Sequence, residues 1–240
     1  MANQEITLFD LPTRPPVKAW SFNPWKVRIA LNYKGLPYKT EWVEYPDIKP
    51  RFKDHLPPAD LYTIPAVILP DGTWIMDSWK IADALEEKYP QPSLRLDSPY
   101  LARMKKILIE IMGKIVGIYV PGVHNNVLGE ASQPYFRRTR EEMVNMTLEQ
   151  LEEKKGGEVG WAAAQPHLQE MTALLKENGD GPFFEGKTPG FADFVWVSLL
   201  IFIRTIGSVQ FAGLLKATGD AEVHEKLLEA TKVWTERDDH

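Results

Sequence analysis

The stretch WSFNPWKVRIA, residues 20–30, holds a lone hydroxyl, Ser21, shortly before Pro24, a residue suited to the first turn of a helix. A serine in this place commonly caps the helix or belongs to a turn. Because a helix N-terminus carries partial positive charge, a hydroxyl there can also donate a hydrogen bond to a bound thiolate. Asn23 is a second polar candidate, although an asparagine before a proline is equally typical of a turn.

The chain contains no cysteine, which excludes disulfides, thiolate metal sites and a catalytic thiol of its own. A serine of ordinary pKa does not act as a base near neutral pH, so Ser21 would serve as a donor to a sulfur that a ligand supplies. A charge-assisted hydrogen bond of this kind contributes roughly 1.5 to 3 kcal/mol, which lowers a thiol pKa by about one or two units.

Two further residue pairs could bind parts of a peptide. Ile64-Pro65 precedes an apolar run, and a trans proline at a strand start is its ordinary interpretation; a cis bond would turn the Ile64 backbone outward for pairing with an extended peptide. Ser78 is expected as the N-cap of a helix, with Asp77 as an acid near the helix dipole. The same pair could bind an amino-acid moiety, its carboxylate on backbone donors and its ammonium on Asp77.

Apolar runs and turn residues place these motifs in one domain. Asp71-Gly72 between two apolar runs is a strong hairpin signal, and prolines before and after residues 24–35 bound a helix there. The element order predicts a thioredoxin-like mixed-sheet domain: strand 6–9, helix 24–35, strand 39–45, irregular segment 46–62 with one turn of helix, hairpin 66–77 and helix 78–89.

The composition changes after the proline-rich segment 91–99, which is predicted as a linker between a domain at 1–90 and a domain at 100–240. The second domain is predicted to be all-helical, because its segments show helical spacing and few turn residues. The expected helical segments are 100–120, 137–155, 165–179, 191–207 and 222–239.

Charge and hydropathy exclude several classes of partner. The formal net charge is -5 and the basic residues are scattered, so a nucleic-acid partner is not expected. The apolar run 194–203 is about half the length that crosses a bilayer, and residues 1–20 lack the features of a secretory signal. A soluble cytoplasmic protein is therefore expected, with no membrane partner. The five histidines are widely spaced, so no metal is expected.

The chain as a whole resembles the cytosolic glutathione transferases, most specifically in Ile64-Pro65 and Asp77-Ser78. SFNPWKVRIAL resembles the serine-type classes, above all the fungal etherase-related class called FuA and the bacterial lignin β-etherases. GKTPGFADFVWVSLL resembles the family segment in which a capping turn and an aspartate, here Asp193, begin a core helix. Gly190 departs from the Ser or Thr usual in that segment, which weakens the helix start by a few tenths of a kcal/mol.

The resemblance implies an N-terminal domain that binds glutathione as co-substrate, and a chain that assembles into a homodimer. It assigns Ser21 as the catalytic hydroxyl and six residues to glutathione binding, namely Asn23, Trp25, Ile64, Pro65, Asp77 and Ser78. The second substrate is expected between the domains, beside the loop 11–20 and the first helix of the second domain. Tyr119, Val120 and Val123 could line that pocket, although such residues at helical spacing are more often core.

Three functions stay open on the sequence. The first is a transferase whose glutathione thiolate attacks an apolar, aromatic electrophile or an aryl ether. The second is a non-catalytic carrier, or ligandin, of phenolic and other aromatic compounds. The third is a regulatory protein on the same fold.

Overall fold

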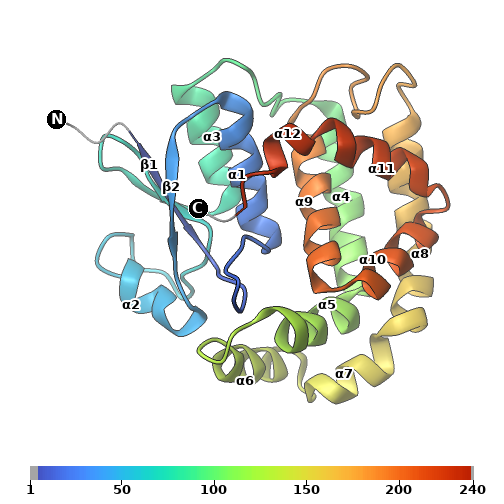
Figure 1. The fold of residues 1–240 in the computed structure, drawn as a ribbon, viewed down its shortest axis with the longest axis horizontal. Helices are drawn as coiled ribbons and strands as arrows, with labels where there is room; N and C mark the ends of the chain where they lie inside the picture. Colours follow the sequence, from blue (N-terminus) through green and yellow to red (C-terminus); the bar gives the residue numbers. More distant parts are fainter. Residues whose placement is uncertain (1–4, 239–240) are drawn as a thin grey trace.

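The computed structural model describes residues 5–238. Its first half contains a four-stranded mixed sheet in the order β2-β1-β3-β4 (Figure 1). The central strand β1 runs parallel to β2 and antiparallel to β3, and β3 pairs antiparallel with β4. The predicted strands and the hairpin are therefore confirmed. The strands are β1 (Ile6–Asp10), β2 (Tyr38–Trp42), β3 (Ala66–Ile68) and β4 (Trp74–Met76).

The β3-β4 turn is built as the Asp71-Gly72 pair predicts. Gly72 has a φ of 84°, a conformation that glycine adopts without steric cost. Its backbone N–H donates to Leu69 C=O at 2.9 Å, and Asp71 Oδ1 accepts from the Thr73 N–H at 3.0 Å. These bonds bring β4 back beside β3, so that β4 leads directly into the next helix.

The helices α1 (Phe22–Lys34) and α3 (Ser78–Lys88) pack together beside the sheet (Figure 1). α1 begins two residues before the predicted start and ends at the predicted Gly35, whose φ is 65°. The predicted irregular segment holds the single turn η1 (Tyr45–Asp47) and the short helix α2 (Ile48–Phe52). The Phe52 ring of α2 meets Phe9 of β1, with ring centroids 5.1 Å apart.

A buried ion pair ties α1 to β1. Arg28 Nη2 lies 2.9 Å from Asp10 Oδ2, and both side chains are fully buried. Arg28 also donates to Thr40 Oγ1 at 3.0 Å, while Asp10 Oδ1 accepts from the Leu11 N–H at 2.7 Å. Burial raises the pKa of Asp10, and the Arg28 charge opposes that rise. The pair fixes the helix that carries Ser21 against the central strand.

The second half is helical, as predicted, but the predicted segments 100–120, 137–155 and 222–239 are each divided into two helices, and two further helices differ from the expectation. α8 begins at Gly157, eight residues before the expected start, and Pro166 lies inside it. α10 was not predicted at all, because it buries only Leu214, Ala217 and Thr218 and so shows little helical periodicity. The elements are α4 (Pro99–Lys114), α5 (Val116–Gly122), η2 (Val123–Val127), α6 (Gln133–Val144), α7 (Leu148–Lys155), α8 (Gly157–Lys176), α9 (Phe191–Ile206), α10 (Ser208–Thr218), α11 (Ala221–Ala230) and α12 (Lys232–Thr235).

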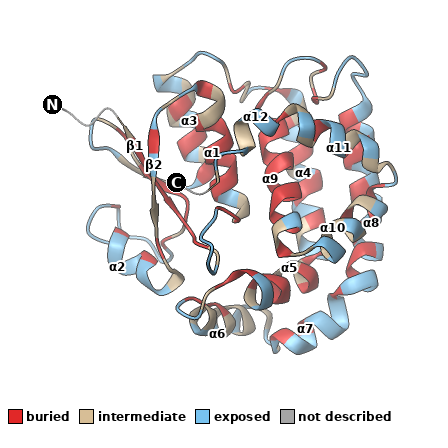
Figure 2. Cartoon of the chain, viewed as in Figure 1, coloured by how far each residue is buried: buried red, intermediate tan, exposed pale blue. Residues whose placement is uncertain are grey.

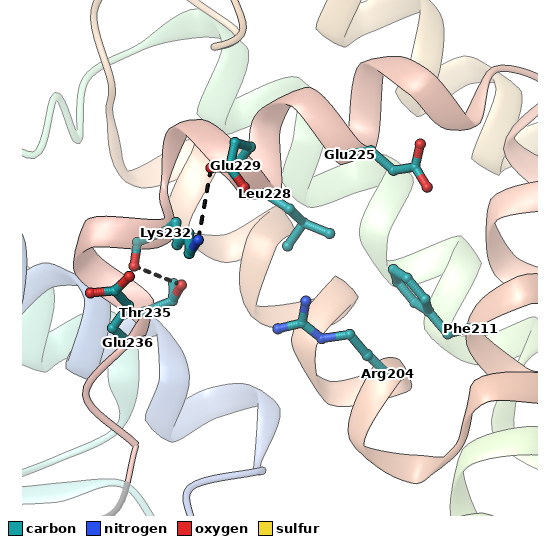
Figure 3. Close-up of a pocket in the computed structure, with 8 residues that line it drawn as sticks. All are labelled: Arg204, Phe211, Glu225, Leu228, Glu229, Lys232, Thr235 and Glu236. Carbon is teal, nitrogen blue, oxygen red and sulfur yellow. Dashed lines mark hydrogen bonds and ion pairs between the residues drawn. The ribbon is translucent and has the colours of Figure 1, made fainter.

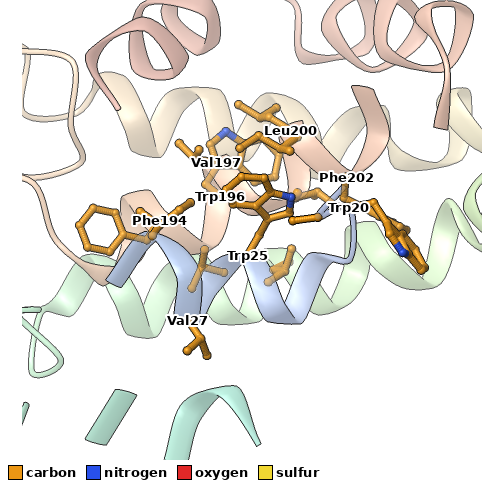
Figure 4. Packing of buried hydrophobic residues seen from close by; sticks show 14 of the residues in the cluster. Trp20, Trp25, Val27, Phe194, Trp196, Val197, Leu200 and Phe202 are labelled. Atoms are coloured by element: carbon orange, nitrogen blue, oxygen red, sulfur yellow. The ribbon is translucent and has the colours of Figure 1, made fainter. Parts of the chain in front are cut away.

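α9 is the central helix of the molecule and is buried along almost its whole length (Figure 2). It packs against α1, and Figure 4 shows Trp25 of α1 among Trp196, Val197 and Phe202 of α9. One cluster of buried side chains therefore extends through both halves. The apolar run of α9 is thus core packing. The predicted domain boundaries at 1–90, 91–99 and 100–240 stay predictions, since this core passes between the halves without a break.

Within residues 5–238, no single helix is long and apolar enough to cross a membrane. One bent pair, Pro99–Lys114 with Val116–Val127, meets the length and composition criteria together across a bend of 68°.

The C-terminal segment crosses back to the first half. Asn32 Nδ2 of α1 donates to Trp234 C=O at 2.7 Å, and Arg237 donates to Tyr38 C=O at 2.8 Å. The Ala19 N–H donates to Asp238 C=O at 2.6 Å. These contacts hold the loop that leads to Ser21.

Candidate functional site

Ser21 occupies the N-cap position of α1, with φ of -73° and ψ of 135°, but its side chain makes no capping hydrogen bond. Its carbonyl accepts from the Trp25 N–H at 3.1 Å, so the helix begins on the backbone alone. The half-buried hydroxyl is therefore available to a ligand at the positive end of α1.

Ser21 shares a cavity of about 200 Å³ with two other predicted site residues, Asn23 and Ile64. The walls come from β1 and its following loop, the start of α1, the η1 and α2 turns, the loop before β3, and α6. The full lining is Leu11, Ser21, Asn23, Tyr45, Ile48, Leu61, Tyr62, Thr63, Ile64, Tyr135 and Arg140. The cavity thus joins a free hydroxyl to aromatic rings and one cation.

The bond between Ile64 and Pro65 is cis, as the peptide-binding interpretation predicts. Among the backbone hydrogen bonds between loop and turn residues, none reaches the N–H or the C=O of Ile64. The Asp77 N–H donates to Pro65 C=O at 3.2 Å, which places the third motif directly beside the second. The two motifs form one continuous surface next to the cavity.

Asp77, not Ser78, is the N-cap of α3, which corrects the expected role of Ser78. Asp77 Oδ1 accepts from the backbone N–H groups of Trp79 at 2.8 Å and Lys80 at 3.2 Å. Asp77 has a φ of 88°, outside the helical region, so the N-cap lies one residue before the predicted Ser78. Ser78 is buried as the first helical residue, and Asp77 stays exposed.

Lys26 is a buried cation beside the start of α1 that the sequence did not single out. Its Nζ donates to Asn23 Oδ1 at 2.8 Å and lies 3.9 Å from the centre of the Phe22 ring. Burial lowers the pKa of Lys26 to about 7; the charge of Asp77 opposes this, and that of Lys105 adds to it. Because Asn23 Oδ1 accepts from Lys26, its amide nitrogen is left as the group that can donate to a ligand.

Tyr45, Tyr135 and Arg140 also line the cavity without having been predicted. The rings of Tyr45 and Tyr135 stack with centroids 6.3 Å apart, and the Arg140 guanidinium lies 5.6 Å from the centre of Tyr45. Burial raises the pKa of Tyr45 to about 12, with Arg140 opposing the rise, so this hydroxyl is neutral at physiological pH. The sequence around these three residues contains no motif that marks a binding site. They come together only when η1 and α6 pack against each other in the folded protein.

Seven predicted residues are not part of the cavity lining: Pro65, Asp77 and Ser78 lie beside it, and four others lie elsewhere. Trp25, Val120 and Val123 are buried in the core, and Tyr119 packs on Phe202 with ring centroids 5.8 Å apart. The expected wall from the segment 115–126 is therefore corrected, since Val120 of α5 and Val123 of η2 are buried in the helical core. Burial raises the pKa of Tyr119, and the Arg140 charge opposes that rise.

A larger hollow of about 490 Å³ lies between the last helices, away from Ser21 (Figure 3). Arg204 of α9 and Lys232 of α12 line it together with three glutamates. Lys232 lies 4.0 Å from Glu229, and the mixed charges of this surface are exposed to solvent. Among the described residues, no group of three or more His, Asp or Glu side chains is arranged to hold a metal ion.

A thioredoxin-like sheet, an all-helical second half and a hydroxyl at the first helix start together define a class of glutathione-binding proteins. The family model for the N-terminal domain of glutathione S-transferases matches residues 20–88, and the model for the C-terminal domain matches residues 105–234. The chain belongs to the glutathione S-transferase family. The predicted fold and family resemblance are thereby confirmed, and glutathione is the co-substrate of this family.

Individual relatives agree with this assignment. The glutathione S-transferase-like protein ustS of Aspergillus flavus is 32% identical over 204 residues, which are 76% of this chain and 74% of that protein. The glutathione transferase GSTFuA3 of Phanerochaete chrysosporium superposes with a TM-score of 0.81 at 31% identity, over 96% of this chain and 97% of its own. CsGST63524 of Ceriporiopsis subvermispora, solved in complex with glutathione, gives 0.80 at 30% identity, over 96% and 98%. The expected likeness to the fungal FuA class is confirmed.

Proposed function

We propose that this transferase uses Ser21 to stabilise the thiolate of glutathione. The observation that carries the proposal is the Ser21 hydroxyl, which lines the cavity and makes no capping bond at the positive end of α1. A hydrogen bond from this hydroxyl favours the thiolate over the thiol by roughly 1.5 to 3 kcal/mol. Asn23, held by Lys26, supplies a second donor from its amide nitrogen.

The rest of glutathione follows from the surface beside the cavity. The N–H and C=O of Ile64, next to Pro65, pair with the backbone of the extended tripeptide as a neighbouring strand would. Its γ-glutamyl end lies at the start of α3, where the hydroxyl and backbone N–H of Ser78 receive the carboxylate. Asp77 receives the ammonium on its second carboxylate oxygen, because Oδ1 already caps the helix.

The second substrate of the proposed reaction is an aromatic electrophile or an aryl ether. Tyr45, Tyr62 and Tyr135 offer rings on which such a compound stacks beside Ser21. The sulfur forms a bond to the electrophilic carbon, and the carbon's bond to its leaving group breaks. A halide leaves with the electron pair of that bond; an aryl ether releases a phenolate, which takes a proton from water.

Replacing Ser21 with alanine tests the proposal. We expect Ser21→Ala to raise the pKa of enzyme-bound glutathione by about one to two units and to lower kcat/KM at neutral pH roughly 10- to 100-fold. The thiolate absorbance in the ultraviolet, titrated against pH, and the rate at saturating glutathione measure the two effects. Ser21→Thr is the matched control, because it keeps a donor at the same atom. An unchanged rate together with an unchanged thiol pKa would remove the role of Ser21.

A non-catalytic carrier of aromatic compounds is the second candidate, and the aromatic lining of the cavity favours it as much as it favours a transferase. Incubation with glutathione and a broad panel of electrophiles and phenols, followed by mass spectrometry, separates the two functions. Binding without conjugates supports the carrier. Absence of glutathione binding by calorimetry would instead support a regulatory protein on this fold.

A homodimer in the cytoplasm completes the proposal. Homodimers are typical of the family, and Ile109 on α4 is 70% exposed, an apolar residue that a partner subunit would cover. Light scattering after size exclusion tests the assembly, and a monomeric mass at micromolar concentration would contradict it. Fluorescence microscopy of the tagged protein tests the location.

A further inference from the structure

We propose that Arg140 selects aromatic second substrates that carry a carboxylate or another anionic group. The proposal rests on the proposed transferase or carrier function of the Ser21 cavity and specifies the ligands of that cavity. Arg140 is the charged residue among the aromatic, aliphatic and neutral polar side chains that line the cavity, so an anionic substituent of a ligand can form a charge-assisted hydrogen bond with it.

Arg140 has no acidic partner among residues 5–238, in contrast to its neighbours on α6. Arg137 pairs with Glu141 at 2.9 Å and with Glu149 at 2.8 Å, and Arg138 lies 3.5 Å from Glu142. Arg140 Nη1 donates a hydrogen bond to a neutral hydroxyl, Thr139 Oγ1, at 3.1 Å. Its positive charge is therefore uncompensated where it faces the cavity.

Aromatic rings hold the Arg140 guanidinium in position. Its central carbon lies 4.6 Å from the centre of the Phe136 ring and 5.6 Å from that of Tyr45. Ring faces of this kind attract the cation and limit its motion, while its N–H groups keep the fork geometry that matches a carboxylate. The side chain is half-buried, so a bond to it is less screened than one on the open surface.

The groups around Arg140 are neutral hydroxyls that do not compete for its charge. Burial raises the pKa of both Tyr45 and Tyr119, and Arg140 opposes each rise. The nearby carboxylate of Glu44 accepts a hydrogen bond from Ser132, and Asp10 is paired with Arg28. An incoming carboxylate therefore meets the Arg140 cation and the phenols of Tyr45 and Tyr135, with the substrate ring on Tyr45 and its electrophilic carbon toward Ser21.

A matched pair of electrophiles tests the selection. A chloro-dinitrobenzoate and its methyl ester react alike with glutathione: the sulfur bonds to the ring carbon and chloride leaves with the electron pair of the carbon–chlorine bond. We expect Arg140→Gln to lower kcat/KM for the acid roughly 10- to 100-fold and to change that for the ester less than about threefold. Arg140→Lys keeps the charge but not the forked N–H geometry. Its kcat/KM for the acid should therefore lie between that of the wild type and that of Arg140→Gln.

Arg137→Gln is the matched control, because it removes an arginine from the same helix that is paired with Glu141 and Glu149 and does not line the cavity. The melting temperature of each variant shows whether the fold is kept, and the KM for glutathione shows whether the glutathione site is kept. A loss of preference for the acid can then be distinguished from unfolding. Equal losses for acid and ester, or no loss for either, would overturn the role of Arg140.

If the wild type conjugates neither compound, the transferase proposal fails, while the proposal for Arg140 is then decided by binding. Calorimetry with the acid and the ester should show preference for the acid in the wild type and loss of that preference in Arg140→Gln. Equal binding of the two compounds to the wild type would refute it.

Discussion

At the scale of single residues, Ser21 differs from two hydroxyls that cap helices with their side chains, those of Ser98 and Thr147. Ser98 Oγ accepts from the Tyr100 N–H at 3.2 Å, and Thr147 Oγ1 accepts from the Gln150 N–H at 3.2 Å. Each stabilises its helix by about 1 kcal/mol. The Ser21 side chain makes no such bond, so α1 forgoes that stabilisation and leaves the hydroxyl to a ligand.

Local motifs made part of this site predictable. Ser21, Ile64-Pro65 and Asp77-Ser78 are each recognisable within a few adjacent residues, because a helix start or an X-Pro bond is a local feature. Arg140 had no such signal, since its relation to Tyr45 arises only when α6 folds onto η1. The Asp10–Arg28 pair was hidden for the same reason: a charged residue inside a helical segment ordinarily predicts an exposed face.

His224 predicts a pH-dependent stability. Its ring is fully buried, with Nδ1 accepting from Trp196 Nε1 at 3.0 Å and Nε2 2.9 Å from Thr172 Oγ1. Burial lowers its pKa from 6.5 to about 4, so the unfolded chain binds a proton in this interval that the folded chain does not. The neutral, buried His224 ring therefore contributes to the free energy of unfolding above pH 6.5. This contribution, at most about 3 kcal/mol, is lost as the pH falls toward 4.

The contribution of His224 is measured as the difference in the free energy of unfolding between the wild type and His224→Gln. Burial raises the pKa of Asp193 to about 7, so its contribution has the opposite sign: it is complete at low pH and lost as the pH rises through 7. The wild-type profile alone therefore mixes two opposed effects. Denaturant titrations should show that the stability lost in His224→Gln grows from pH 4.5 to pH 7; a constant difference would contradict the buried neutral imidazole.

At the scale of elements, α9 begins with an incomplete cap. Asp193 Oδ2 accepts from the Gly190 N–H at 2.8 Å and Oδ1 accepts from the Phe184 N–H at 2.9 Å. Gly190 supplies no side-chain oxygen in return. Asp193 is a folding residue in this structure, because both of its oxygens are used to fix the turn that starts the central helix.

Gly190→Ser is expected to stabilise the protein. Residue 190 has an extended backbone with φ of -149°, and a Cβ there would lie 3.4 Å from Arg95 Cβ, an ordinary contact distance. The serine hydroxyl can then accept a hydrogen bond from the first turn of α9, which contributes from a few tenths to about 1 kcal/mol. Thermal unfolding should shift upward by a few degrees. Gly190→Ala adds only the Cβ, and an equal gain there would rule out the cap as the cause.

The elements that the sequence missed are those with weak periodicity. α10 turns only a few small or apolar residues inward, and the first turns of α8 are rich in alanine and glycine. Their helical state depends on packing between α8, α4 and α10, which no single segment displays. The hairpin and α1, in contrast, had turn residues and end signals of their own.

At the scale of the whole molecule, both halves share one core through α1 and α9. Phe194 is fully buried, and its ring meets Tyr33 of α1 at 5.0 Å and Trp234 of α12 at 5.7 Å between centroids. The sheet and the helical half are thus joined by the same side chain. We expect them to unfold together in one transition.

Phe194→Ala should destabilise both halves by about 3 to 5 kcal/mol, because it opens a cavity in their common core. The melting temperature falls on the order of 10 °C, and hydrogen exchange accelerates in β1 as well as in α8. Val209→Ala, at a site on α10 that is 77% exposed, is the control and should change little. Two separate transitions, or faster exchange confined to the helical half, would contradict a shared core.

The packing of α1 on α9 also limits how this molecule can be recombined with its relatives. A chimera joined between α3 and α4 would take each half from a different parent. Trp25 and Trp196 would then pack against side chains that differ from their present contacts. A working graft must therefore transplant the facing residues of α9 together with the donor's sheet. Exchanging only the α6 residues that line the second-substrate cavity leaves the packing of α1 on α9 intact. It therefore changes ligand specificity with fewer substitutions.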